Sequence, residues 1–150
     1  MSKDIVIYYA TVTGNSESIA QRASDNVAAA GWSPKLVNLA DIKPADLASN
    51  AQVALFVAST WGDGEPPTDA EDFFFALGTE TPDLGNLRYA VFGLGDRDYD
   101  QFNGFTKNLD ARLSKLGAKS FYERGEGDRD FDSDYAKWKP GFLAALATLA

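Results

Sequence analysis

The sequence predicts an α/β fold in which a parallel five-stranded sheet carries helices on both of its faces. Apolar strand-like runs alternate with amphipathic helix-like stretches, the central runs are continuously apolar, and three of the runs end in Gly-rich loops. The chain has 150 residues, of which 45% are hydrophobic, and it shows no repeat, linker or low-complexity segment. A single compact domain spanning residues 1–150 is therefore expected.

The expected strands differ in how strongly the sequence indicates them. They are Ile5–Tyr9, Lys35–Asn38, Val53–Ala58, Tyr89–Gly93 and, more weakly, Ser120–Glu123. The central strands are the most continuously apolar, as strands covered on both faces must be. Because connections between parallel strands are right-handed, the intervening helices are expected on both sides of the sheet.

Two amphipathic helices are predicted, and each is followed by a glycine suited to a C-terminal cap. The first helix has an apolar face of Ile19, Ala23, Val27 and Ala30, and Gly31 follows it. The second has an apolar face of Phe102, Phe105, Leu109, Leu113 and Leu116, and Gly117 follows it. A short helix is also predicted within residues 40–49, around the run from Pro44 to Leu47.

Proline residues mark the beginning of one further helix and interrupt another. Pro66-Pro67 precedes Thr68-Asp-Ala-Glu71, which has the spacing of a capping box, and the run Phe73–Phe75 that follows is predicted to be core. The last helix carries the apolar residues Trp138, Phe142, Leu146 and Leu149. Pro140 lies among them, which predicts a kink or a late helix start near that residue.

The composition excludes several classes of function. The chain has no Cys and no His, so it lacks a thiolate nucleophile, an imidazole base, a disulfide framework and the usual zinc ligands. Its net charge of −8 argues against binding to nucleic acid or to an anionic membrane. No basic leader or long apolar segment opens the chain, which fits a cytoplasmic location.

Most of the 22 acidic residues gather in loops rather than spreading evenly along the chain. They cluster in residues 63–72, 96–100 and 123–134, where Arg97, Arg124 and Arg129 are the opposing cations. This distribution favours a basic partner protein that is steered by charge.

The loop after the first strand has the chemistry of a phosphate cradle. Thr11, Thr13 and Ser16 supply hydroxyls, Asn15 supplies an amide, and Gly14 lets backbone N–H groups approach an anion at a helix N-terminus. The loop contains no Lys or Arg, unlike a Walker A loop, and it does not have the glycine pattern of a dinucleotide-binding loop. These features favour a monophosphate ester.

The loops after the third and fourth strands each offer an aromatic ring. Trp61 and Tyr99 lie in polar, Gly-containing loops, where an aromatic side chain suggests that a planar ligand packs on it. All three loops follow strands of one parallel sheet, so they are expected to meet at its carboxyl edge. The sequence thus predicts a site for a planar heterocycle that carries a phosphate.

These residues carry a family resemblance. Thr11-Val-Thr-Gly-Asn-Ser-Glu17, Ser59-Thr-Trp-Gly-Asp-Gly64 and Val91-Phe-Gly-Leu-Gly-Asp-Arg-Asp-Tyr99 resemble the FMN-binding loops of short-chain flavodoxins. Within that family they most resemble the flavodoxin-like module of cytochrome P450 reductase and sulfite reductase flavoprotein, and the stand-alone MioC-type proteins. It implies the flavodoxin-like strand order 2-1-3-4-5 and FMN as the cofactor.

The resemblance also implies which residues bind FMN. The phosphate would be held by Thr11–Ser16, the isoalloxazine would lie between Trp61 and Tyr99, and a carboxylate at Asp128 would lie near the ribityl chain or flavin. The full set of cofactor-binding residues that it implies is Thr11, Val12, Thr13, Gly14, Asn15, Ser16, Ser59, Thr60, Trp61, Gly62, Asp63, Gly64, Leu94, Gly95, Asp96, Tyr99, Phe102, Asn103 and Asp128. No catalytic residue and no metal ligand is expected.

The function implied is a monomeric electron carrier that shuttles single low-potential electrons between an NADPH-dependent flavodoxin or ferredoxin reductase and acceptor proteins. One alternative is an FMN-binding regulatory or assembly module, and another is a small NAD(P)H:quinone reductase that turns over its own substrate. A phospho-receiver domain shares the fold but needs acidic residues where Thr11 and Ser59 stand.

Overall fold

The computed structural model describes residues 3–10, 14–48, 52–59, 68–94, 104–128 and 130–149. The elements in chain order are β1 (Asp4–Ala10), α1 (Asn15–Ala29), β2 (Ser33–Asn38), the 3-10 helix η1 (Leu39–Asp41), α2 (Pro44–Ala48), β3 (Gln52–Ser59), α3 (Thr68–Glu80), β4 (Leu87–Leu94), α4 (Gly104–Lys115), β5 (Lys119–Ser120), β6 (Gly125–Gly127) and α5 (Phe131–Ala147). The predicted strands and helices are therefore present, although several bounds differ by a few residues.

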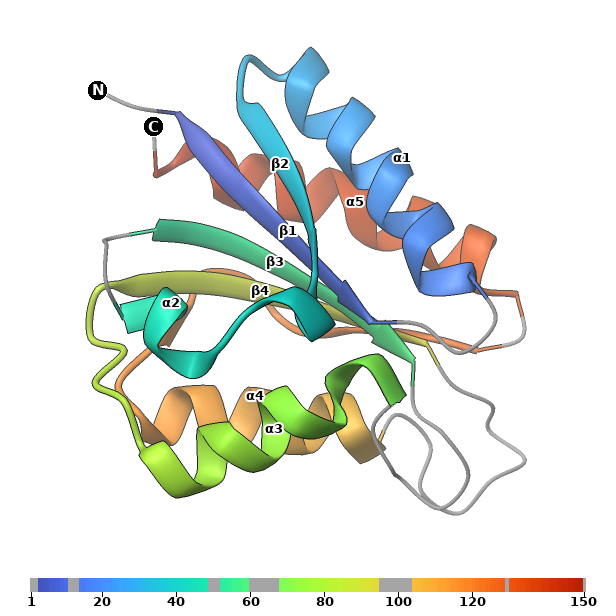
Figure 1. Ribbon diagram of the computed structural model, residues 1–150. Helices are drawn as coiled ribbons and strands as arrows, with labels where there is room; N and C mark the ends of the chain where they lie inside the picture. Colours follow the sequence, from blue (N-terminus) through green and yellow to red (C-terminus); the bar gives the residue numbers. More distant parts are fainter. Residues whose placement is uncertain are drawn as a thin grey trace.

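The sheet confirms the predicted architecture. All neighbouring strands are parallel, and their order is β2-β1-β3-β4-β5, with β6 also paired to β4. Figure 1 shows α1 and α5 on one face of the sheet and α3 and α4 on the other. This is a doubly wound sheet with the flavodoxin-like strand order.

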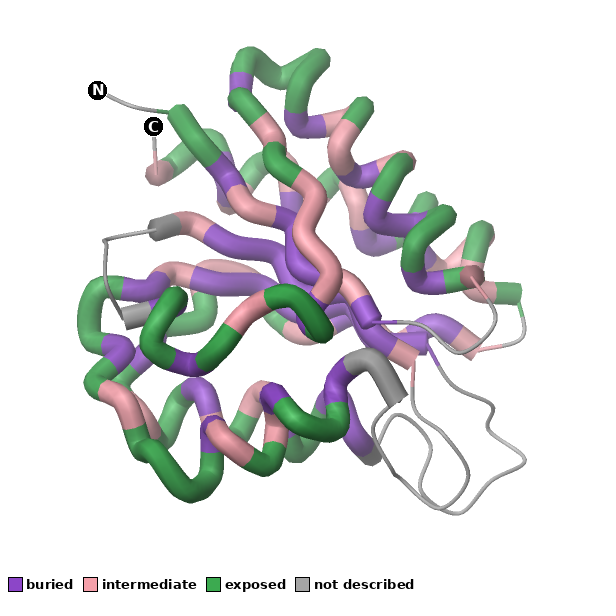
Figure 2. Tube along the Cα trace, in the orientation of Figure 1, coloured by how far each residue is buried: buried purple, intermediate pink, exposed green. Residues whose placement is uncertain are grey.

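Two hydrophobic cores lie on the two faces of the sheet, and the central strands contribute to both. One core joins α1 and α5 to Ile5, Ile7, Leu55, Val57 and Phe92. The other joins η1, α2, α3 and α4 to the opposite faces of the same strands. Figure 2 shows the result, with the central strands largely buried and the outer faces of the helices exposed.

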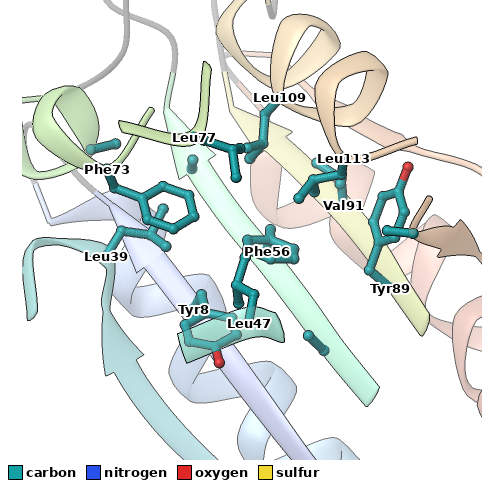
Figure 3. Close-up of a cluster of buried hydrophobic side chains, with 14 of the residues drawn as sticks. Tyr8, Leu39, Leu47, Phe56, Phe73, Leu77, Tyr89, Val91, Leu109 and Leu113 are labelled. Carbon is teal, nitrogen blue, oxygen red and sulfur yellow. The ribbon is translucent and has the colours of Figure 1, made fainter. Parts of the chain in front are cut away.

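Aromatic rings fill the core beneath α3 and α4. The Tyr8 and Phe56 rings stack with their centroids 5.1 Å apart, and Phe56 meets Tyr89 edge to face at 6.3 Å. Figure 3 shows Phe73 beside Leu39, with Leu77 and Leu109 on the neighbouring helices. Alternation along the strands directs Tyr8 and Phe56 to this side of the sheet, while Ile7 and Leu55 face the other.

Both predicted glycine caps are confirmed by the backbone. Gly31 has φ +93° and Gly117 has φ +102°, a conformation that residues with a Cβ rarely adopt. The apolar face predicted for the first helix is correct for Ile19, Ala23 and Val27, which are fully buried. Ala30 is exposed instead, because it is the C-cap residue and lies beyond the last turn of α1.

The prediction that the whole run Phe73–Phe75 is core was wrong for its last member. Phe73 is buried and Phe74 is half-buried, whereas Phe75 is 73% exposed. Successive helical residues point about 100° apart, so three consecutive rings cannot all face one core. Phe75 is therefore a large apolar side chain on the outer surface of α3.

The fifth strand also departs from the prediction. Residues 119–120 pair with the beginning of β4 and residues 125–127 with its end, whereas Tyr122 and Glu123 of the predicted strand Ser120–Glu123 lie outside the sheet. The rings of Phe121 and Tyr122 pack on Phe142 and Trp138 of α5, with centroids 5.9 and 5.6 Å apart. This packing draws the chain off the sheet before β6 rejoins it.

Helix α5 begins at Phe131 and continues past Pro140, so the alternative of a late start near Pro140 was wrong. Pro140 is exposed, while Trp138 and Phe142 on either side are buried in the core. The predicted short helix is confirmed as α2, which follows η1. Within the described part of the chain, no helix is long and apolar enough to cross a membrane.

Candidate functional site

The candidate site lies at the carboxyl edge of the sheet, where four strands end side by side. Ala10, the last residue of β1, pairs with Ala58, and Ser59 follows at the end of β3. Ser59 pairs with Leu94 at the end of β4, and Leu94 pairs with Gly127 at the end of β6. The segments that leave these strands therefore start from neighbouring points, as binding at the edge of an open α/β sheet requires.

A pair of hydroxyls links the first two of these segments. The Ser16 Oγ lies 2.7 Å from the Ser59 Oγ, although the residues are 43 positions apart in the chain. Ser16 is fully buried in the first turn of α1, and Ser59 is half-buried at the end of β3. The structure thus brings together two residues that the sequence analysis assigned to one site.

Gly14 shapes the beginning of α1. It is the N-cap residue with φ +91°, and its carbonyl accepts a hydrogen bond from the Ser18 N–H at 3.1 Å. A Cβ at this position would meet no atom within 4 Å, so glycine is needed for its conformation rather than for space. Gly14 brings no capping side chain, and the first N–H groups of a helix have no acceptor within it. Such an end suits a phosphate.

Asp128 lies at the other side of the edge, directly after β6. Its backbone N–H donates to the Asp134 Oδ2 at 2.9 Å, which ties this turn to the first turn of α5. Asp128 is half-buried. The bond positions the turn that follows β6, where Asp128 stands next in the chain to Gly127.

Gly125 lets β6 approach both β4 and α5. A Cβ at Gly125 would lie 2.4 Å from Phe92 Cδ2 and 2.8 Å from Trp138 Cδ1, distances that real Cβ atoms do not show. The Trp138 Nε1 donates to the Glu123 carbonyl at 3.0 Å, which holds the preceding turn. Only a residue without a side chain fits between these rings, so glycine at this position sets the path of β6.

An ionic network fixes the same segment to α4. The Arg124 Nη1 donates to the Asp110 Oδ2 at 2.6 Å, and the Arg124 Nε to the Glu126 Oε2 at 3.2 Å. The Tyr89 hydroxyl donates to the Asp110 Oδ1 at 2.5 Å. Burial, and then the hydrogen bond to Asp110, raise the pKa of Tyr89 far above its usual value of 10.0, so the phenol stays a donor.

Sequence reasoning did not assign these supporting residues to the site. Arg124 was noted only as a cation among acidic residues, and Asp110 was not singled out. The glycines at positions 125 and 127 were the available signal, since alternating glycines after an apolar run are typical of close backbone approach.

Several predicted site residues lie outside the described residues. They are Thr11, Val12, Thr13, Thr60, Trp61, Gly62, Asp63, Gly64, Gly95, Asp96, Tyr99, Phe102 and Asn103. The proposed stacking of a ring between Trp61 and Tyr99 belongs to this group. The predicted residues that the structure does place at the edge are Gly14, Asn15, Ser16, Ser59, Leu94 and Asp128.

The fold and this edge define a class of protein: a doubly wound α/β domain with a phosphate-compatible site at the carboxyl ends of its strands. Residues 7–138 match the family model described as Flavodoxin. The chain therefore belongs to the flavodoxin family, whose cofactor is FMN. The described residues fit the phosphate of FMN, because α1 starts at Gly14 without a side-chain cap and the hydroxyls of Ser16 and Ser59 lie 2.7 Å apart at that end of the helix.

Proteins of similar sequence support the assignment to the flavodoxin family. The chain is 36% identical over 151 residues to NADPH–cytochrome P450 reductase from Oryctolagus cuniculus, covering 96% of this chain and 22% of that protein. It is 41% identical over 141 residues to the sulfite reductase [NADPH] flavoprotein alpha-component from Photobacterium profundum, covering 93% and 23%. The chain thus spans less than a quarter of the length of these relatives.

Solved structures match over nearly the whole chain. A flavodoxin from Streptococcus pneumoniae TIGR4 superposes with a TM-score of 0.84 at 26% identity, covering 98% of this chain and 99% of its own. A short-chain flavodoxin associated with a PDU bacterial microcompartment superposes with a TM-score of 0.81 at 26% identity, covering 100% and 99%. The fold is that of a short-chain flavodoxin.

Proposed function

We propose that this chain is a single FMN-binding domain that carries single low-potential electrons from a reductase to acceptor proteins. The observation that most supports the proposal is the meeting of Ser16 and Ser59 at the carboxyl edge of the sheet, with Ser16 in the first turn of α1, which has no side-chain cap. In a chain of the flavodoxin family, that edge is where the cofactor phosphate is expected. When bound, FMN supplies the one-electron chemistry.

The proposed roles of the residues follow from their places along this edge. Residues 11–16 bind the phosphate through backbone N–H groups and hydroxyls, with Ser59 adding its hydroxyl from β3. Residues 60–64 and 94–103 enclose the flavin, with Trp61 and Tyr99 on its two faces. Asp128 presents a carboxylate to the flavin or to its ribityl chain. The protein residues bind and orient the cofactor, and no residue is proposed to act as an acid or base.

Negative charge near the flavin sets the proposed potential. Asp63 and Asp96 are predicted to lie in the enclosing loops, and Asp128 follows β6 at the same edge. A carboxylate near a group that gains negative charge on reduction opposes that gain, which lowers the reduction potential. We therefore propose a low-potential carrier.

The proposed partners are basic redox proteins. The chain has a net charge of −8, and two of its relatives are named as NADPH-linked reductases or reductase components. We infer that an NADPH-dependent flavodoxin or ferredoxin reductase supplies electrons, and that the carrier, a monomer, has no substrate of its own. Charge attraction would speed these encounters and would be screened by salt.

The experiment that tests the proposal measures cofactor and electron transfer together. The purified chain is reconstituted with FMN, its visible absorbance is recorded, and its reduction by NADPH is followed with and without an NADPH-dependent ferredoxin reductase. The expected result is a yellow protein that NADPH reduces only when the reductase is present. Rapid reduction by NADPH alone, with turnover of a quinone, would favour an enzyme. Failure to bind FMN would exclude the proposal.

A matched pair of variants connects that result to the described site. Ser59→Ala removes a hydroxyl that is proposed to contact the phosphate, whereas Thr79→Ala removes one near the end of α3 that donates to the Ala76 carbonyl at 3.3 Å. FMN affinity is expected to fall in the first variant and to stay unchanged in the second. Equal affinities in both would contradict the assignment of the phosphate site.

A further inference from the structure

A shallow groove lies between the outer surfaces of α3 and α4. It has a volume of about 590 Å³ and is lined by Glu71, Asp72, Phe74, Phe75, Gly78, Thr79 and Arg112. Among the described residues, Phe75 is the only large hydrophobic side chain that is exposed. A Phe that is 73% exposed beside a groove marks a surface that another molecule could cover.

The floor of the groove is held rigid by Arg112 of α4. Its guanidinium lies over the Phe74 ring, 4.2 Å from the centroid, and its Nη1 donates to the Phe74 carbonyl at 3.3 Å. Gly78 makes room for this arrangement, because a Cβ there would lie 2.9 Å from the Arg112 Nη1. The Phe74 ring in turn meets Phe105 edge to face at 5.2 Å. The Arg112 guanidinium therefore contacts Phe74 at the bottom of the groove.

The rim of the groove is acidic. Glu71 and Asp72 are exposed and precede Phe75 by four and three residues, so they lie on the same side of α3 as the exposed ring. No cation among the described residues forms an ion pair with either carboxylate. An apolar surface with carboxylates on its rim matches a partner that presents an apolar group surrounded by Lys or Arg.

The groove lies on a helix that starts on the same side of the molecule as the candidate cofactor edge. Helix α3 follows β3 and starts on the side of the molecule where β1 and β3 end, as Figure 1 shows. Glu71 lies in the first turn of α3, and Phe75 lies one turn further along. The Glu71 end of the groove therefore lies towards the side of the molecule that carries the candidate cofactor edge, which is the side where a redox partner is expected to approach.

On these observations, and resting on the electron-transfer function proposed above, we propose that this groove is a docking surface for a basic redox protein. An apolar group of the partner packs on Phe75 and the Arg112–Phe74 floor, while its Lys or Arg side chains pair with Glu71 and Asp72. A second copy of this chain does not fit, because it would bring a second net charge of −8 to an acidic rim.

Electron transfer to cytochrome c tests the proposal, since cytochrome c is a basic haem protein with lysines around an apolar haem edge. The FMN-loaded protein is reduced with dithionite under anaerobic conditions, and its reoxidation by cytochrome c is followed by stopped flow at low and high salt. Phe75→Ser is expected to lower the second-order rate constant about five- to tenfold, as loss of a central aromatic contact does. Phe75→Leu, which retains apolar area, is expected to restore most of the rate.

Charge variants distinguish the effect of the acidic rim on electron transfer from the effect of the protein's overall negative charge. The double variant Glu71→Gln, Asp72→Asn is expected to slow the transfer and weaken its salt dependence, whereas Asp25→Asn on α1, on the other face of the sheet, is expected to change neither. FMN affinity and reduction potential, measured on every variant, should match the parent protein because these residues lie on the outer surface of the helices.

The possible outcomes distinguish the docking surface from the proposed function. If Phe75→Ser transfers electrons as fast as the parent, or if Asp25→Asn slows transfer as much as the rim variant, the docking surface is wrong and the carrier function stands. If the parent protein passes no electrons to cytochrome c, the carrier function fails, and the docking proposal fails with it.

Discussion

Arg124 and Asp110 form a 2.6 Å ion pair that joins the segment between β5 and β6 to helix α4. Both side chains are mostly buried, with 28% and 22% exposed. The same Asp110 carboxylate accepts the Tyr89 hydroxyl, so β4 is part of the network as well. Through Asp110, the network therefore connects α4, β4 and the segment that leads into β6, the strand that precedes Asp128.

Breaking this pair is expected to destabilise the fold. Arg124→Gln removes the cation from the partly buried Asp110 and leaves it the hydrogen bond from the Tyr89 hydroxyl, so the free energy of unfolding should fall by about 1–3 kcal/mol. Urea denaturation measures the change. The matched control is Arg22→Gln, which breaks a pair with Asp132 whose side chains are 42% and 66% exposed. It should cost under about 1 kcal/mol, and an equal loss in both variants would contradict the role given to Arg124.

A methyl group at Gly125 is expected to disturb the packing of β6. Gly125→Ala places a Cβ against the Phe92 and Trp138 rings, and overpacking of this kind costs about 1–3 kcal/mol. The near-ultraviolet circular dichroism of Trp138 should change with it. Gly31→Asn is the control for packing, because its Cβ meets no atom within 4 Å, so any loss of stability in that variant comes from the backbone at φ +93° and not from contact with other side chains. Unchanged stability and spectrum in Gly125→Ala would show that β6 can shift freely.

The Ser16–Ser59 pair predicts an asymmetry between two conservative substitutions in the protein without cofactor. Ser59→Ala leaves the fully buried Ser16 hydroxyl without its partner, at a cost of about 1–3 kcal/mol. Ser16→Ala leaves the half-buried Ser59 hydroxyl closer to water, so it should cost less. Thermal or urea unfolding of both single variants and the double variant checks this. A larger loss in Ser16→Ala would contradict the asymmetry.

Tyr135 predicts a loss of stability in alkali. Burial raises its pKa from 10.0 to about 12. The unfolded chain therefore ionises this tyrosine first, so the stabilisation is fully present below pH 10 and is lost as the pH rises towards 12. The slope for this single group is at most about 1.4 kcal/mol per pH unit. Unfolding free energies measured between pH 9 and 12 should fall less steeply in Tyr135→Phe than in the parent.

Phenolate absorbance provides an independent check of the same group. In the folded parent protein, Tyr135 should contribute a step near pH 12, and this step should be absent in Tyr135→Phe. The substitution also removes the hydrogen bond from the Tyr135 hydroxyl to the Asn26 Oδ1, which measures 2.8 Å, so some stability is lost at neutral pH as well. A full titration of all tyrosines near pH 10 would show that Tyr135 is not buried in solution.

Much of the fold could be predicted from the sequence because its signals are local and agree with one another. Apolar runs predicted β1, β3 and β4, and Gly31 and Gly117 marked the ends of helices. The order of the strands could not be predicted in this way, because periodicity does not specify which strands are neighbours. The prediction of strand order depended on the family resemblance.

The features that could not be predicted from the sequence depend on tertiary packing. Phe75 looks like a core residue in a run of aromatics, and only the orientation of α3 shows that it faces outward. In the same way, Gly125 becomes part of a strand only because Phe92 and Trp138 leave a space that suits glycine. At the site, the sequence indicated which loops meet, but the ion pair of Arg124 with Asp110 joins residues whose contact no local pattern encodes.

The division of the fifth strand into β5 and β6 has a consequence for self-association. An exposed sheet edge can template pairing with another molecule, and short edge strands reduce that hazard. Here the runs on this side are two and three residues long, and the turn between them packs on α5 instead of extending the ladder. At the opposite edge, β2 contains Pro34, which has no N–H to donate, followed by Lys35. Both borders of the sheet are therefore poor templates for strand addition, and this favours a protein that stays dispersed at high concentration.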